Sequence, residues 1–187
     1  MGMMSIVSRG DLLRKLNFSK SIIVFSAIAG AAINYAINLL VVFVFALLNG
    51  VSIGLGWFVI IPLFIELILL STGISFILAS SFVKYRDIGP IWEVALQAGL
   101  YATPIIYSLT FIIQRGQVSI AKIMMLNPIA QIVQDLRYYI IYSGSTRGWD
   151  LIQNHWLAMV PYLLPILIFI IGYLVFNKQS KRFAEIL

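Results

Sequence analysis

The chain has 187 residues, of which 61% are hydrophobic and only 11% are charged. Soluble domains carry roughly a quarter charged residues, so this composition excludes an ordinary soluble domain and indicates an integral membrane protein. Cysteine is absent, which excludes disulfide bonds and cysteine-ligated metals. The net charge of +6 does not predict nucleic-acid binding, because the basic residues flank apolar segments, where they set orientation and meet anionic lipid.

Residues 1–20 are a short basic segment ahead of the first apolar stretch. They lack the compact apolar core and the cleavage site of a secretory signal peptide. Two interpretations stay open, namely one or two amphipathic helical turns or a basic collar beside the membrane. The apolar residues that would share one side of such a helix are Ile6, Val7, Leu13 and Leu16.

The first predicted span covers 21–48 and is longer than the ~20 residues that cross a bilayer. Small and polar residues recur in it every four positions, at Ser26, Gly30, Asn34 and Asn38. Such a stripe suits close helix packing, and asparagines in hydrocarbon need partners. The alternative is a hydrated path faced by Asn34, Tyr35 and Asn38. The pair Asn49-Gly50 then predicts a tight turn.

The second predicted span covers 55–83 and carries Glu66 near its middle. A carboxylate at that depth is neutral, paired or functional. The sequence does not name its partner, which we expect to be an asparagine of the first span or a residue of a second subunit.

The stretch 84–107 joins a charged loop to an apolar helix with a polar stripe. In the third predicted span, 91–113, helical spacing places Glu93, Gln97 and Tyr101 on one face, which we expect to avoid lipid. The alternative is that Glu93 and Gln97 reach only the headgroup layer near the loop. Thr103-Pro104 predicts a break, because proline removes a backbone donor and kinks a helix.

Residues 114–155 are polar but periodic. Asn127-Pro128 predicts a helix start, with asparagine as the N-cap and proline at the first helical position. Apolar and polar residues then alternate on opposite faces, which is typical of a helix on the outer membrane surface or dipping into it. The apolar set is Ile129, Ile132, Val133, Leu136 and Ile140, and the polar set is Gln131, Gln134, Asp135 and Tyr138. A fourth span is predicted over 156–176, with a basic tail over 177–187.

Charge counting predicts the topology. The first 20 residues hold four Lys/Arg, the loop 84–87 two and the tail three, whereas the turn 49–54 holds none. The positive-inside rule then places both termini and the central loop in the cytoplasm of a plasma-membrane protein. The outer segment 114–155 holds four basic residues over a much greater length.

Catalytic motifs are absent from the sequence. His155 is the single histidine, and neither HExxH nor a GxxxxGK[ST] phosphate-binding loop occurs. The chain therefore does not hold ATP through such a loop, and uphill transport would need a partner or an ion gradient. An embedded enzyme would have only Glu66 and Glu93 as candidate groups, so we expect no enzymatic activity and no bound metal.

Five segments, in the same order along the chain, resemble the permease subunits of type-2 ABC exporters. Within that family they resemble the branch that exports lipid-linked polysaccharides such as O-antigen, capsule and teichoic acid. They are SIVSRGDLLRKLNF, FVKYRDIGPIWEVALQ, TPIIY, LNPIAQIVQDLRY and GYLVFNKQSKRFAEIL. They are spread over nearly the whole chain. The resemblance implies a separate ATPase subunit that binds ATP and Mg²⁺, a second permease copy, and a lipid-linked glycan as substrate. The alternatives are an ABC exporter of a drug or other lipid-like substrate and a non-transporting structural or regulatory subunit.

The resemblance also assigns roles to residues. A first element that couples to the ATPase would hold Asp11, Arg14 and Lys15, and a second would hold Lys84, Arg86 and Asp87. The translocation path would include Asn34, Tyr35, Asn38, Glu66, Glu93, Gln97 and Tyr101. The outer gate would include Thr103, Pro104, Tyr107, Asn127 and Pro128.

One departure from the family concerns length. Family members carry an amphipathic helix and two further spans before the first coupling element, and this chain starts with MGMM inside the matching segment. We expect a truncated product or a start codon assigned too late, which upstream DNA encoding two in-frame apolar spans would support. The predicted fold is a single all-α transmembrane domain over 1–187, with four spans and re-entrant or interfacial outer helices.

Overall fold

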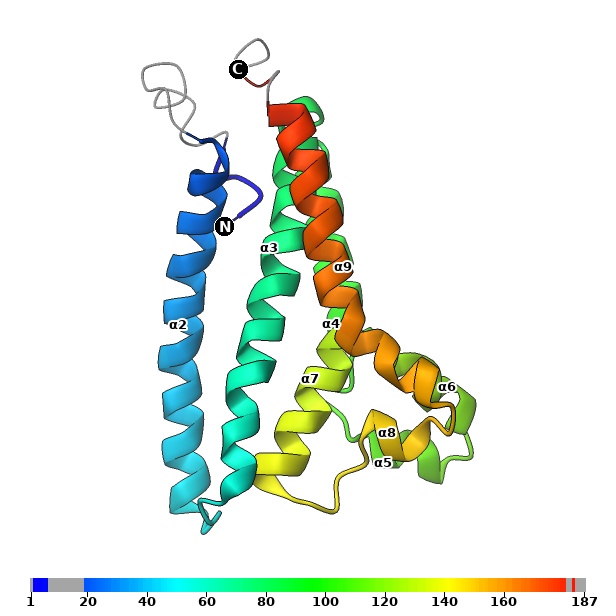
Figure 1. The fold of residues 1–187 in the computed structure, drawn as a ribbon. Coiled ribbons are helices and arrows are strands. Elements are labelled where there is room, and N and C mark those ends of the chain that lie inside the picture. The colour runs from blue at the N-terminus through cyan, green and yellow to red at the C-terminus, as the bar shows by residue number, and fades with distance from the viewer. Residues whose placement is uncertain (1, 7–18, 181–182, 184–187) are drawn as a thin grey trace. The chain divides into compact units, whose positions relative to one another are not determined.

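A computed structural model describes residues 2–6, 19–180 and 183. Throughout these residues the secondary structure is helical, with turns and loops between helices and no strand (Figure 1). The elements in chain order are α2 (Ser21–Leu48), η2 (Leu55–Val59), α3 (Ile60–Lys84), α4 (Ile88–Ala102), α5 (Leu109–Gln114), α6 (Val118–Met124), α7 (Pro128–Leu136), η3 (Arg137–Ile141), α8 (Gly148–Leu151) and α9 (His155–Ser180).

Three helical stretches in the described chain are long and apolar enough to cross a membrane, namely Ser21–Leu48, Leu55–Lys84 and His155–Ser180. They confirm the predicted class of an all-α polytopic membrane protein. The span expected over 91–113 is not one continuous helix. Helix α4 has 15 residues and is about 22 Å long at 1.5 Å per residue, short of a hydrocarbon core of about 30 Å. It ends at Ala102, directly before the predicted break.

The predicted turn after the first span is confirmed. Gly50 has φ +81°, a conformation that a residue with a side chain rarely adopts. Its N–H donates to the carbonyl of Leu47 at 3.0 Å, and the N–H of Val51 donates to that of Ala46 at 3.1 Å. These bonds cap the last carbonyls of α2 in the pattern that glycine allows at helix ends.

The described residues divide into two compact units. The first unit falls within Met1–Leu40, Ile68–Glu93 and Ile166–Leu187, and the second within Val41–Leu67 and Val94–Pro165. The long helices contribute residues to both units. Each unit has its own buried apolar cluster.

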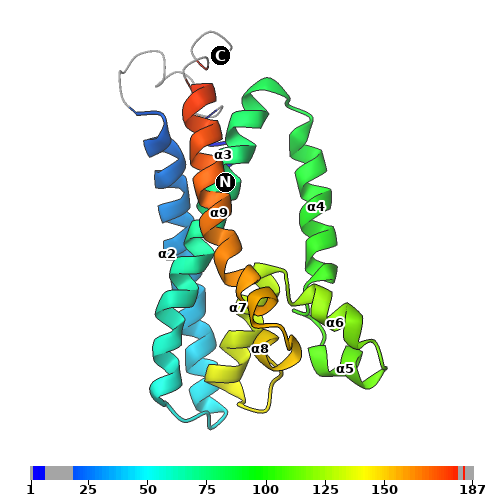
Figure 2. The ribbon, with the colours of Figure 1, turned by 45° about the vertical axis from the view of Figure 1, so that its right-hand side comes forward.

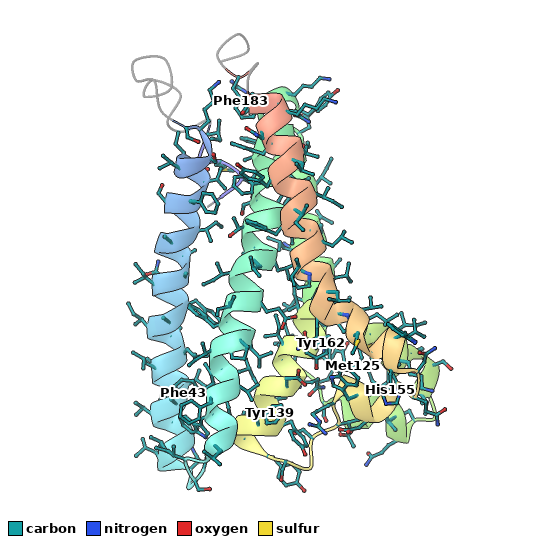
Figure 3. The ribbon with its side chains drawn as sticks, in the orientation of Figure 1. Phe43, Met125, Tyr139, His155, Tyr162 and Phe183 are labelled. Carbon is teal, nitrogen blue, oxygen red and sulfur yellow. The ribbon has the colours of Figure 1, made fainter. Side chains whose placement is uncertain are left out.

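The first unit is centred on Phe76 of α3, which is fully buried. Its ring lies 4.9 Å from that of Phe176 and 5.2 Å from that of Phe25, measured between ring centroids. Tilted and edge-on aromatic pairs at these distances stabilise a core beyond the area that they bury. The ring of Phe183 lies 5.5 Å from that of Phe176 and extends this cluster (Figure 3).

Helices α3 and α9 approach each other closely at two glycines of the first unit. A Cβ on Gly73 would lie 2.6 Å from the Cα of Phe169, and a Cβ on Gly172 would collide with the carbonyl oxygen of Gly73. Small residues at a helix crossing let backbones touch, which strengthens packing in lipid, where the hydrophobic effect does not drive helices together.

The second unit packs the short helices around Met125, which is fully buried (Figure 3). Its cluster joins α5, α6, α7, α8 and the first turn of α9 through Leu109, Ala121, Met125, Ala130, Ile152 and Ala158. Gly116 has φ +77° and closes the turn between α5 and α6. The unit therefore has an apolar core of its own.

We expect Gly73→Ala to destabilise the protein, because the added methyl group would overlap the backbone of α9. Overpacking of this kind costs about 1–3 kcal/mol. The matched control is Gly30→Ala on α2, where nothing lies within 4 Å of the added Cβ. There alanine favours the helix by about 0.5–1 kcal/mol. Thermal unfolding in detergent measures both variants, and equal effects would contradict the close crossing.

Candidate functional site

The predicted helix break is stabilised by hydrogen bonds from outside the helix. In a continuing helix the N–H of Ile105 would bond to the carbonyl of Tyr101, but here it donates to the carbonyl of Thr103 at 2.7 Å. The hydroxyl of Tyr107 donates to the carbonyl of Tyr101 instead, also at 2.7 Å. The chain after Pro104 therefore folds back and supplies a donor that the helix no longer provides.

Arg137 supplies two further donors. Its guanidinium donates to the carbonyl oxygen of Pro104 at 2.7 Å and to that of Ile105 at 2.5 Å. Hydrogen bonds from a charged donor are about twice as strong as neutral ones. The break is thus held in place from η3, more than 30 residues further along the chain.

Asn127 ties the start of α7 to the same break. Its side-chain oxygen accepts the N–H of Ile129 at 3.0 Å, as the predicted N-cap requires, and Pro128 occupies the first turn. Its amide nitrogen donates to the hydroxyl of Thr103 at 3.2 Å. All five residues predicted for the outer gate therefore lie in one place, namely Thr103, Pro104, Tyr107, Asn127 and Pro128. Their role as a gate stays a prediction.

Helix α7 buries much of the polar face that the sequence assigns to it. Gln131 is 0% exposed, Gln134 2% and Asp135 4%, whereas Ile129 is 39% exposed. A helix lying on the membrane surface would present these polar groups to water. Here they face protein, and buried polar groups require partners.

Asp135 is the centre of the resulting network. Its Oδ2 accepts the amide of Gln131 at 2.8 Å and the hydroxyl of Tyr162 at 2.7 Å, and that hydroxyl also accepts the indole N–H of Trp149 at 3.0 Å. Tyr162 projects from α9 (Figure 3). Burial raises the pKa of Asp135 above the usual aspartate range, although its hydrogen bonds to Tyr162 and Gln131 oppose that rise.

Glu66 of α3 lies beside this network. Its carboxylate interacts electrostatically with Asp135 and Gln131. The polar neighbours of Glu66 in the described chain are thus on α7, a like-charged Asp135 and the amide of Gln131, and the sequence could not identify them. Three buried oxygens have no hydrogen-bond partner among the described residues, namely Glu66 Oε1, Gln131 Oε1 and Asp135 Oδ1. The cluster has acceptors in excess of donors.

Arg147 fastens the loop before α8 to η3. Its guanidinium lies 3.9 Å from the ring centroid of Tyr138, donates to the hydroxyl of Tyr139 at 3.0 Å and pairs with Asp150 at 3.1 Å. The hydrogen bond to Asp150 raises the pKa of Arg147, and the guanidinium lowers the pKa of Asp150. The Asp150 side chain is 45% exposed, and an ion pair open to water contributes little to stability. The aromatic contacts therefore matter more than the charge pair for the position of Arg147.

The remaining residues predicted for the path lie on α2 and α4. On α2, in the first unit, Asn34 and Asn38 are exposed, Tyr35 is half-buried, and the amide of Asn38 donates to the carbonyl of Asn34 at 2.8 Å. On α4, Glu93, Gln97 and Tyr101 are exposed.

The two predicted coupling elements differ in what the structure describes. Lys84, Arg86 and Asp87 lie exposed at the tight turn from α3 to α4 (Figure 2). Asp11, Arg14 and Lys15 fall outside the described residues.

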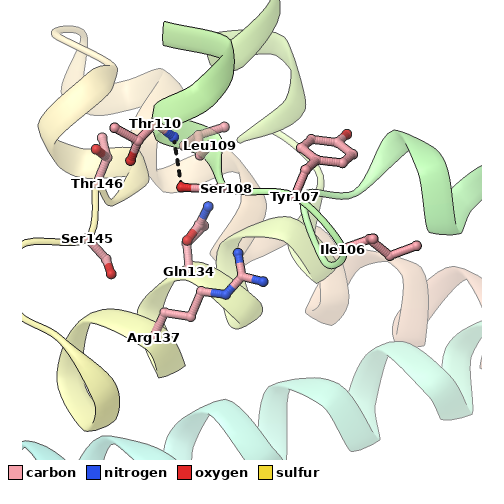
Figure 4. Close-up of a pocket in the computed structure, with 9 residues that line it drawn as sticks. All are labelled: Ile106, Tyr107, Ser108, Leu109, Thr110, Gln134, Arg137, Ser145 and Thr146. Carbon is pink, nitrogen blue, oxygen red and sulfur yellow. Dashed lines mark hydrogen bonds between the residues drawn. The ribbon is translucent and has the colours of Figure 1, made fainter. Parts of the chain in front are cut away.

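A pocket of about 180 Å³ lies between the segment after the break and α7–η3. Gln134 and Arg137 extend toward the loop that carries Ser108, whose hydroxyl caps α5 by accepting the N–H of Thr110 at 3.3 Å (Figure 4). The other lining side chains are Ile106, Tyr107, Leu109, Ser145 and Thr146. In the described part of the chain no group of three or more His, Cys, Asp or Glu is placed to hold a metal ion.

Long apolar helices, an interrupted helix and a buried polar network define a polytopic membrane protein. No family model matches the chain. It is similar to two O-antigen export system permease proteins, both named RfbA and from Klebsiella pneumoniae. They are 25% and 24% identical to it over 184 residues, which are 98% of this chain and 66% of each relative. The predicted resemblance to polysaccharide-exporter permeases is thereby confirmed.

We expect Asp135→Asn to stabilise the protein at neutral pH. Both hydrogen bonds to Asp135 use Oδ2, so one amide oxygen can accept both, and the new NH₂ replaces an oxygen that has no partner. Because the pKa of Asp135 is raised, its contribution to stability is complete below the unfolded pKa and is lost as pH rises through the folded value. The advantage of asparagine should therefore grow with pH.

Unfolding temperatures of both forms between about pH 4.5 and 8 measure this difference, and a constant difference would contradict the prediction. Asp135→Leu is the contrasting variant. It leaves the Tyr162 hydroxyl and the Gln131 amide without an acceptor, which costs about 1–3 kcal/mol for each buried group.

We also expect Asn127 and Thr103 to be energetically coupled. Asn127→Ala should cost about 1 kcal/mol through loss of the cap alone. Combined with Thr103→Val, it should show a coupling of about 0.5–1.5 kcal/mol, the net value of one hydrogen bond. Additive effects in this double-mutant cycle would mean that the bond across the break does not stabilise it.

Proposed function

We propose that the chain is the permease subunit of an ATP-driven exporter that moves a lipid-linked polysaccharide across the plasma membrane. The observation that carries the proposal is the similarity, along 98% of the chain, to proteins named as O-antigen export system permeases. ATP and Mg²⁺ would be bound by a separate ATPase subunit, since the sequence has no phosphate-binding loop of the GxxxxGK[ST] type.

The turn between α3 and α4 suits contact with that ATPase. It carries Lys84, Arg86 and Asp87, which are exposed, and Tyr85 is 56% exposed beside them. Exposed aromatic and arginine side chains are enriched at the centres of protein interfaces. By the positive-inside rule this turn and both termini face the cytoplasm, where an ATPase would meet them.

A second copy of the permease would complete the path. Asn34 and Asn38 are exposed on a span whose other exposed residues are mainly apolar, such as Ile33 and Ile37. Amide side chains at membrane depth need protein or water around them. We infer that this face of α2 meets the second copy or the glycan path between the copies. The first would be the helix packing, and the second the hydrated path, that the sequence left open for this stripe of small and polar residues.

Glu66 takes a different role in this proposal. Its carboxylate lies near the like-charged Asp135 and the amide of Gln131, so it belongs with the buried polar network of α7. The exposed residues Glu93, Gln97 and Tyr101 of α4 would then be the ones that line the path.

The proposal is tested by co-purification with the ABC ATPase of the same organism that would serve this exporter, with both proteins expressed from their full natural reading frames. We expect the tagged permease to retain the ATPase and Arg86→Glu to reduce its recovery at least tenfold, because the substitution reverses a charge at the docking turn. Arg115→Glu is the matched control, since Arg115 is also exposed but lies beyond the break, after α5.

Two results would overturn this assignment. One is a permease that never retains the ATPase although it is folded in the membrane. The other is equal loss of the ATPase with Arg86→Glu and Arg115→Glu, which would remove the distinction between the docking turn and the outer segment.

A further inference from the structure

We propose that the pocket between the broken helix and α7–η3 is a subsite for one sugar unit, and that it prefers a unit with an acidic substituent. The inference rests on the proposed function for the origin of the sugar, a glycan passing the outer segment. Its chemistry rests on the lining of the pocket alone.

The size of the pocket fits one sugar ring. Its volume is about 180 Å³. Sites for drug-sized ligands usually measure about 300–1,000 Å³. The pocket is therefore below the size typical of a drug-sized ligand and suits a single six-membered ring with its hydroxyl groups.

The lining offers what a sugar needs. Hydroxyl groups of Ser108, Thr110, Ser145 and Thr146 can donate and accept, and the amide of Gln134 does both. Leu109 and Ile106 supply an apolar patch for the C–H face of a ring. Gln134 is only 2% exposed, so its amide is held in position by the surrounding protein before any ligand arrives.

The charge of the pocket favours an anion. Arg137 is its one charged lining residue, and no acidic residue lines it in the part of the chain that the structure describes. A guanidinium has five N–H donors, and two of those of Arg137 are directed at the carbonyls of Pro104 and Ile105. The bonds to the break hold the cation in position, and the remaining donors suit the carboxylate of a uronic acid or a sugar phosphate.

An occupant would join two parts of the outer segment. Ser108 and Thr110 follow the break, whereas Gln134 and Arg137 belong to α7 and η3. A sugar that contacts both would add hydrogen bonds between them, so occupancy would stabilise the arrangement of the break that the structure shows. A ligand can shift such an equilibrium only through contacts that one state makes and the other lacks.

The test is saturation-transfer NMR on the permease–ATPase complex in nanodiscs, with glucuronate, glucose 6-phosphate and glucose as probes. We expect transfer to at least one of the two acidic sugars and at least tenfold weaker binding of glucose. The acidic sugar that binds better identifies a carboxylate or a phosphate as the preferred substituent.

Variants separate the pocket from the rest of the surface. Gln134→Leu and Thr146→Val keep side-chain size and remove polar atoms, and each should weaken binding about tenfold. Ser119→Ala is the control, because this exposed serine of α6 lies outside the pocket and should leave binding unchanged. Should Gln134→Leu fail to fold, Thr110→Val takes its place with the same expectation.

No transfer to any of the three sugars, or transfer that the pocket variants leave unchanged, would overturn the subsite. The permease assignment would then still stand if the ATPase co-purifies and Arg86→Glu releases it. Conversely, acidic sugars that bind through Gln134 to a chain that never retains an ATPase would support the subsite and refute the exporter.

Discussion

Where α4 ends ahead of Pro104, backbone carbonyls at the break need donors from outside the helix, and side chains from further along the chain provide them. Lipid offers no hydrogen bonds, so interrupted helices occur at membrane depth only where protein or water satisfies the freed groups. Tyr107 and Arg137 take this part at the break after α4, and Asn127 adds a bond through Thr103. The short helices α5, α6 and α7 bring these side chains to the break, which explains why a polar stretch of this length is folded.

The same demand explains the unusual side that α7 buries. Its amide and carboxylate groups bond to Tyr162 and to one another and lie beside Glu66, so polar contacts add to the apolar packing of Ala130 and Ile132 in holding this helix. In a protein whose surroundings are themselves apolar, hydrogen bonds and close packing distinguish one arrangement from another better than hydrophobicity does. The glycine crossing of α3 and α9 in the first unit follows the same logic with backbone atoms.

Local signals in the sequence predict much of this molecule. Composition gives its class, Asn49-Gly50 a turn, Thr103-Pro104 a break and Asn127-Pro128 a helix start, because each depends on neighbouring residues only. The sequence does not predict that Glu66 lies near Asp135, that Arg137 reaches Pro104, or that α7 turns its polar face inward. These contacts join residues about 30 to 70 positions apart, and a helical stripe does not reveal which side meets protein. The third predicted span is interrupted where Thr103-Pro104 indicates, since hydropathy continues across the proline although the helix does not.

The two donors that share one oxygen of Asp135 have an evolutionary consequence. An aspartate codon becomes an asparagine codon by a single base change, and the amide would satisfy more of the neighbouring oxygens than the carboxylate does. Mutation alone would therefore replace the acid readily if stability were all that selection acted on at this position. If natural variants of this gene keep aspartate at position 135, its negative charge is under selection for function. If asparagine is frequent there, selection at this position acts on folding alone.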